Sequence, residues 1–165
     1  MNNESHKNIL IIDNDENSVI EYKEYIETDP YFKNNTHVFS IDTIRGAVEI
    51  LKEVNFDVII LDLNLLDSKG IDSLMSLDTI TPVIVVSWHV DYETMRDCLL
   101  NGAYGYISKP VSQHNLNNRL KLAIENPWLR RACNYRILKH LYGLEKSRKT
   151  AIIDPKIWKQ IKQYL

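Results

Sequence analysis

The stretch that most constrains this chain is the apolar run at residues 56–62, which ends abruptly on the carboxylate of Asp62. Five of its seven residues are apolar and three are β-branched, which is typical of a short strand buried on both faces of a parallel sheet. In open α/β sheets, ligands bind at the edge formed by the carboxyl ends of the strands. Taken alone, Asp62 fits either a reactive group there or a carboxylate that caps a helix or stabilises a loop.

Apolar runs of the same kind alternate with segments of helical periodicity along the first 126 residues. This alternation requires crossover connections, and it predicts an α/β fold with a doubly wound, five-stranded parallel sheet between two layers of helices. Helical periodicity places Met75 and Tyr92 on the inner faces of their helices. The predicted strands are residues 8–12, 37–41, 56–62, 83–87 and 104–108, and the predicted helices are approximately residues 19–28, 44–51, 70–77, 91–101 and 112–126.

The composition is that of an ordinary globular protein with room for one domain and a small appendage. The chain has 165 residues, of which 44% are hydrophobic and 25% charged. No apolar run approaches the length of a membrane span, and residues 1–7 lack the apolar region of a signal peptide. We therefore expect a cytoplasmic protein. Cys98 and Cys133 have no metal-ligand spacing and are interpreted as unreactive thiols.

The net charge of −2 conceals two parts of opposite charge. Residues 127–165 carry ten Lys or Arg and two acids, a balance of +8, whereas residues 1–126 carry −10. The split indicates two parts with different roles, or a basic tail attracted to its own acidic body. We expect domains at 1–126 and 127–165.

Chemically active groups follow four of the predicted strands. Asp13 follows the first strand, Asp62 the third, Ser87 the fourth and Lys109 the fifth. Two close carboxylates suit Mg²⁺, which prefers oxygen ligands. A phosphoryl group could lie between that ion, the hydroxyl and the ammonium group, with Asp62 as the nucleophile.

Together with Tyr106, three residues before the lysine, and with the dipeptide 109–110, this set resembles the receiver domain of two-component response regulators. The resemblance covers roughly residues 7–126. It implies a flavodoxin-like fold with strand order 2-1-3-4-5. It also implies that an Asp accepts a phosphoryl group from a histidine kinase or a phosphotransfer protein, with Mg²⁺ as the cofactor.

The resemblance also implies a role for each site residue. Asp62 would be the phospho-acceptor, and the metal ligands would be Asp13, Asn14, Asp62 and the backbone carbonyl of Asn64. Ser87 would be the switch hydroxyl, Lys109 the phosphoryl contact and Tyr106 the aromatic switch that moves inward. The peptide bond between Lys109 and Pro110 would be cis. Taken singly, Ser87, Tyr106 and Lys109 also fit a cap, a half-buried phenol and a surface lysine.

The chain departs from the receiver pattern at several positions. Asn14 replaces the second acid of the metal-binding pair, which predicts weaker Mg²⁺ binding unless the loop shifts to bring in Asp15 or Glu16. Trp88 follows the switch hydroxyl, where it either covers the acceptor in part or packs outward. Leu66 replaces a proline common in the family, and Asn64 with His89 occupies the positions that tune the lifetime of the phospho-form.

Two apolar stripes of helical periodicity are predicted within residues 127–165. They could be buried against the receiver, a second copy of the chain or a partner. The basic residues could also contact nucleic acid, but two short helices lack the three-helix core of a helix-turn-helix, which favours a homodimer or partner docking over DNA.

We interpret the chain as a receiver without an enzymatic output domain, and therefore not an enzyme, which signals through altered protein–protein interaction. The partners would be a histidine kinase or phosphotransfer protein and a downstream protein, without membrane association. One alternative is a pseudo-receiver that binds partners without phosphorylation. The other is a small DNA-binding regulator that uses its basic tail.

Overall fold

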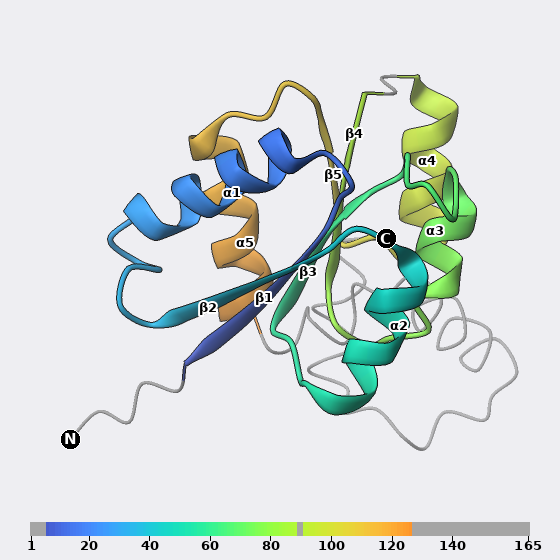
Figure 1. Cartoon of the computed structure of the whole chain (residues 1–165). Helices are drawn as coiled ribbons and strands as arrows, with labels where there is room; N and C mark the ends of the chain where they lie inside the picture. Colours follow the sequence, from blue (N-terminus) through green and yellow to red (C-terminus); the bar gives the residue numbers. More distant parts are fainter. Residues whose placement is uncertain (1–5, 89–90, 127–165) are drawn as a thin grey trace, which may run out of the picture.

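The computed structural model describes residues 6–88 and 91–126, which form one five-stranded parallel sheet with the order β2-β1-β3-β4-β5 (Figure 1). This architecture confirms the predicted doubly wound α/β fold and its flavodoxin-like strand order. The predicted segment 127–165, with Cys133, lies outside the described residues. The strands are β1 (Lys7–Ile12), β2 (Thr36–Ile41), β3 (Val58–Asp62), β4 (Val83–Ser87) and β5 (Gly105–Ser108).

Five helices connect the strands and cover both faces of the sheet. Helices α1 and α5 lie on one face, and α2, α3 and α4 lie on the other (Figure 1). Side chains of Asp15, Thr43, Asp91 and Ser112 cap four of the helices at their N-termini. The helices are α1 (Glu16–Thr28), α2 (Ile44–Glu53), α3 (Ile71–Ser76), α4 (Tyr92–Leu100) and α5 (Gln113–Glu125).

The central strand β3 divides the core into two layers. All five of its residues are buried, as its apolar run predicts. Val58 and Ile60 pack in the layer with α1 and α5, whereas Ile59 and Leu61 pack in the layer with α2, α3 and α4. This alternation is the two-residue period of a strand. It leaves Asp62, the last residue of the strand, at the carboxyl edge of the sheet.

The predicted inward positions of two helical residues are wrong. Met75 is 48% exposed, because α3 has only six residues and the adjacent Leu74 takes the inner position. Tyr92 is 69% exposed. It lies six positions before the buried Cys98, which places it about 120° away around α4.

None of the helices in the described ranges is long and apolar enough to cross a membrane.

Candidate functional site

The parallel sheet brings the predicted strand-end residues to one edge. Asp62 and Ser87 are the last residues of β3 and β4, and Asp13 and Lys109 directly follow β1 and β5. All four side chains are buried. Buried charges are costly unless they are paired, so their presence at this edge needs a specific arrangement of partners.

Lys109 supplies that arrangement by bridging the two carboxylates. Its Nζ donates hydrogen bonds to Oδ2 of Asp62 at 2.6 Å and to Oδ2 of Asp13 at 3.0 Å. Burial alone would lower the pKa of Lys109, but the hydrogen bonds to Asp62 and Asp13, and their charges, raise it above its usual value. The lysine therefore remains an ammonium group between the two acids.

Each carboxylate is also held by its own loop. Oδ1 of Asp13 accepts a hydrogen bond from the backbone N–H of Asp15 at 2.9 Å, and Oδ1 of Asp62 accepts one from the N–H of Asn64 at 2.9 Å. Burial raises the pKa of Asp13, against the opposing effects of the Asp15 N–H and of Lys109. One ammonium faces two carboxylates, so the buried group carries a formal charge of −1 and attracts a cation.

Ser87 and Tyr106 form a second contact beside the charged group. Burial raises the pKa of Tyr106, while a hydrogen bond with the Ser87 side chain lowers it. The backbone carbonyl of Ser87 accepts a hydrogen bond from the N–H of Lys109 at 2.8 Å. Tyr106 packs against the core layer that contains Cys98 of α4. The structure therefore connects the hydroxyl at the site with the side of the molecule that carries α4.

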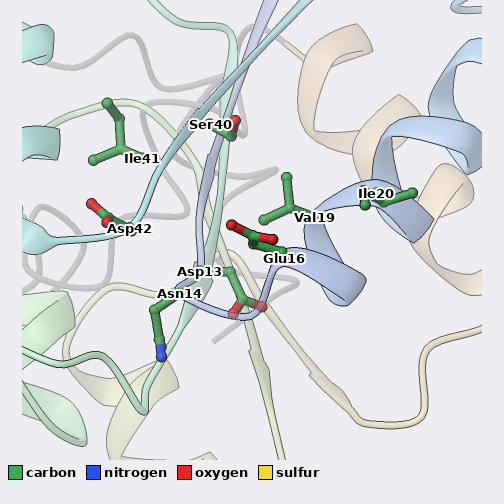
Figure 2. A pocket seen from close by; sticks show the side chains of 8 residues that line it. All are labelled: Asp13, Asn14, Glu16, Val19, Ile20, Ser40, Ile41 and Asp42. Atoms are coloured by element: carbon green, nitrogen blue, oxygen red, sulfur yellow. The ribbon is translucent and has the colours of Figure 1, made fainter.

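An open cleft of about 390 Å³ lies beside Asp13, between the β1–α1 turn and the end of β2 (Figure 2). Figure 2 shows Asp13 and Asn14 on the turn into α1, with Ile41 and Asp42 across from them. Glu16, at the first position of α1, lines the same cleft. A donor group or ion can reach the edge of the site from this side. The lining residues are Asp13, Asn14, Glu16, Val19, Ile20, Ser40, Ile41 and Asp42.

Of Asp15 and Glu16, the two acids expected to compensate for Asn14 if the loop shifts, Asp15 is engaged elsewhere. Asp15 is the N-cap of α1, and its two oxygens accept hydrogen bonds from the backbone N–H of Asn17 at 3.2 Å and from Oγ of Ser18 at 2.7 Å. Ser18 also lies 3.5 Å from Nζ of Lys109. Sequence analysis did not find this contact of Ser18 with the site, because a serine in a first helical turn is common.

The donor set fits Mg²⁺. The two carboxylates of Asp13 and Asp62 and the amide oxygen of Asn14 are hard oxygen donors, and Mg²⁺ commonly uses one or two carboxylates while keeping several waters. Within residues 6–88 and 91–126, three or more His, Cys, Asp or Glu side chains do not cluster to form a larger metal site. These residues therefore fit a Mg²⁺ ion that is weakly held by few protein ligands.

The structure bears differently on the remaining expectations. The peptide bond between Lys109 and Pro110 is cis, as expected. Trp88 is 65% exposed, so most of its indole lies open beside the site, and any packing against the basic tail falls outside the described residues. His89 also lies outside them. Leu66 is 78% exposed.

Comparison with known proteins identifies the family of this chain and its fold. The family model of the response regulator receiver domain matches residues 9–121. The chain belongs to this family, whose members are signalling modules of two-component systems and generally not enzymes. Receiver domains generally bind Mg²⁺ at the phosphorylation site, and response regulators interact with histidine kinases or phosphotransfer proteins.

Two relatives show the extent of the similarity. The cell cycle transcriptional regulator CtrA of Caulobacter vibrioides is 30% identical over 91 residues, and the transcriptional regulatory protein KdpE of Mycobacterium tuberculosis is 37% identical over 89 residues. Each match covers 53% of this chain and 39% of the relative. The chain thus spans less than half the length of these relatives.

Solved structures show the same fold. A two-component response regulator from Clostridium difficile superposes with a TM-score of 0.66 at 20% identity, covering 73% of this chain and 97% of that chain. A response regulator receiver domain protein from Clostridium thermocellum gives a TM-score of 0.64 at 24% identity, covering 74% and 98%.

Proposed function

We propose that this chain is a receiver that accepts a phosphoryl group on Asp62 from a histidine kinase or a phosphotransfer protein. The observation that carries the proposal is the buried bridge of Lys109 between Asp62 and Asp13. A purely structural ion pair has no need of a second buried acid beside an open cleft. A site that receives a phosphoryl group needs both a nucleophilic oxygen and cations around it.

In the proposed transfer, a carboxylate oxygen of Asp62 attacks the phosphorus of the donor phosphohistidine. A P–O bond forms, the P–N bond breaks, and the imidazole leaves with the electron pair and takes up a proton. Lys109 then pairs with one phosphoryl oxygen, and the hydroxyl of Ser87 donates a hydrogen bond to another phosphoryl oxygen. The ligands of Mg²⁺ would be Asp13, Asn14, Asp62 and the carbonyl of Asn64, and the bound ion supplies positive charge to the phosphoryl oxygens.

The proposed signal is a shift between two conformations. When Ser87 turns toward the phosphoryl oxygen, its contact with Tyr106 changes, and the phenol moves inward. That movement alters the surface formed by α4, β5 and α5, and with it the affinity for a downstream protein. The output is thus a changed protein–protein interaction and not a reaction catalysed by an attached domain.

The proposed organisation is a receiver at residues 1–126 and a basic extension at residues 127–165, acting in the cytoplasm. A homodimer would form through the surface of α4, β5 and α5 or through the extension. The charge of +8 on the extension also permits contact with DNA, which we consider the weaker alternative.

Phosphorylation of the full chain by acetyl phosphate with Mg²⁺ tests the proposal. We expect wild-type protein to gain an acid-labile, hydroxylamine-sensitive phosphoryl group and Asp62→Asn to gain none while keeping its circular dichroism spectrum. Asp72→Asn, which changes an exposed aspartate in the first turn of α3, is the matched control and should behave as wild type. Equal phosphorylation of Asp62→Asn would refute the assignment.

Asn14 supports a second candidate, a pseudo-receiver that binds partners without phosphorylation. An amide lines the cleft at the position of an acid, and Asp15 is engaged as a helix cap. A wild-type protein that binds no Mg²⁺ at physiological concentrations would favour this alternative.

A further inference from the structure

The acceptor loop, residues 63–70, follows Asp62 and is a compact turn closed by its own hydrogen bonds. The backbone N–H of Gly70 donates to the carbonyl of Leu63 at 2.7 Å, and the N–H of Leu65 donates to the carbonyl of Ser68 at 3.1 Å. Leu63 and Leu65 are buried and anchor the base of the turn. The tip has no such anchor at Leu66, which is exposed.

Asp67, at the tip of this turn, reaches across to the N-terminus of α2. Its Oδ1 accepts a hydrogen bond from the backbone N–H of Ile44 at 3.0 Å, and its Oδ2 accepts one from the N–H of Arg45 at 3.0 Å. These are the first two residues of α2, more than twenty positions earlier in the chain. The hydrogen bonds from Arg45 and Ile44 lower the pKa of Asp67, so it is a carboxylate at neutral pH.

Helix α2 already has a cap of its own. The Oγ1 atom of Thr43 accepts a hydrogen bond from the N–H of Gly46 at 3.3 Å. The N–H groups that Asp67 engages are the two that this local cap leaves open, since the first turn of a helix has no internal acceptors. The contact therefore ties the acceptor loop to α2 as well as capping the helix.

Further hydrogen bonds hold the segments on either side of this contact. The backbone N–H of Asp13 donates a hydrogen bond to the carbonyl of Ile41 at 3.1 Å. Ile41 lies three residues before Ile44, whose N–H donates to Asp67. At the other end of the acceptor loop, Asn64 donates to Asp62, which accepts from Lys109. The connection between β2 and α2 is thus held on one side by the backbone N–H of Asp13 and on the other by the carboxylate of Asp67.

We propose that Asp67 is a positioning residue for phosphoryl transfer, which holds the acceptor loop so that the carbonyl of Asn64 can bind Mg²⁺. This inference rests on the proposed function. The reason is that the Mg²⁺ ligands carry little charge. Because Asn14 brings no charge to the site, Mg²⁺ binding depends more on the placement of the remaining ligand oxygens. A carboxylate with two backbone partners fixes the loop tip more firmly than a single hydrogen bond would.

The test is a Mg²⁺ titration of the full 165-residue chain, followed through amide NMR signals of the loop. We expect Asp67→Ala to weaken Mg²⁺ binding by about tenfold, the lower end of the range for residues that orient metal ligands. Asp67→Asn keeps one acceptor oxygen and should give an intermediate loss. This variant also serves if Asp67→Ala folds poorly.

The matched control is Thr43→Ala, which removes the other cap of α2 without touching the acceptor loop. It should lower the melting temperature as Asp67→Ala does, while keeping Mg²⁺ affinity within about twofold of wild type. Unchanged affinity in Asp67→Ala, or equal losses in both variants, would overturn the inference and leave the proposed function standing. Wild-type protein that binds no Mg²⁺ would overturn the proposed function itself.

Discussion

Two lysine–aspartate networks lie at different places in this molecule, and they have different structures. At the carboxyl edge of the sheet, Lys109 is shared between Asp13 and Asp62, and its side chain is 4% exposed. Between α1 and α5, Lys121 contacts Asp29 at 3.1 Å with its side chain 30% exposed. The first network holds an excess of buried negative charge, and the second pairs one charge with one opposite charge.

The second network is completed by neutral groups. Asn117 donates hydrogen bonds from Nδ2 to the carbonyl of Tyr25 at 2.7 Å and to Oδ2 of Asp29 at 3.1 Å, so α5 is joined to α1 near the end of that helix. Asp29 also accepts the N–H of Tyr31 at 2.9 Å. This network fixes two helices together. The excess negative charge at the site instead attracts a cation, although each oxygen of Asp13 and Asp62 already accepts a hydrogen bond.

The largest expected effect comes from removing the lysine at the site. Lys109→Met leaves two buried carboxylates without a cation and should lower the free energy of unfolding at pH 7 by about 3 kcal/mol. Mg²⁺ should restore part of that loss, because it supplies positive charge at the same place. Lys121→Met, the matched control, should cost less than about 1 kcal/mol. Urea unfolding measures both, and equal losses would remove the distinction between the networks.

Asn117→Ala tests whether the junction of α1 and α5 is structural only. The side chain is buried, and its removal takes away one of the two donors to the carbonyl of Tyr25 and one of the two donors to Oδ2 of Asp29. The donors that remain are Gln113 and Lys121. We expect a loss of about 2 kcal/mol in unfolding free energy. The rate of phosphorylation by acetyl phosphate should stay at the wild-type value. A rate that falls in parallel with stability would show that the junction also serves the site.

Asn14→Asp tests whether the side chain at position 14 contributes to Mg²⁺ binding at the site. The variant places an acid beside Asp13, as the receiver pattern has it, and should tighten Mg²⁺ binding by about tenfold, or about 1.4 kcal/mol. Without Mg²⁺ the added charge should destabilise the fold, because it repels Asp13 and Asp62. Calorimetric titration and thermal unfolding measure the two effects. If Mg²⁺ affinity does not change, the side chain at position 14 does not bind the ion.

The smallest expected effect is the acid dependence of the helix junction. Burial alone would raise the pKa of Asp29, but hydrogen bonds from Tyr31, Lys121 and Asn117 hold it below its usual value of 3.8. Asp29 therefore stabilises the fold above that value, and this contribution is lost as pH falls through the lower folded pKa. The stability difference between wild type and Asp29→Asn should shrink from about pH 6 to about pH 2. A stability difference that stays constant over this pH range would show that the pKa of Asp29 is not lowered by folding.

The sequence predicted the sheet and the strand-end groups for a clear physical reason. Buried parallel strands appear as continuous apolar runs, and the residue at which each run stops must lie at the carboxyl edge. Asp13, Asp62, Ser87 and Lys109 were found in this way, and the sheet brings them to one edge. The pattern predicted that these side chains share one edge, but not which of them are in contact. Individual contacts depend on the strand order, which came from the resemblance and not from the pattern.

Other features could not be predicted from local patterns. Asp67 meets α2 across more than twenty residues, and a polar residue in a loop carries no sign of a distant partner. The exposure of Met75 and Tyr92 depends on the short length of α3 and on where α4 begins relative to the sheet. Helical periodicity gives a face to each residue but does not say which turns of the helix are covered.

The proposed function requires that the carboxyl edge forms a working phosphoryl site although Asn14 replaces an acid. The most direct measurement is a titration of the full chain with Mg²⁺ and then beryllofluoride, a phosphoryl mimic, followed through amide NMR signals of Ser87 and Tyr106. We expect a saturable, Mg²⁺-dependent change at both residues that disappears in Asp62→Asn. No change in folded wild-type protein would contradict it and would favour the pseudo-receiver.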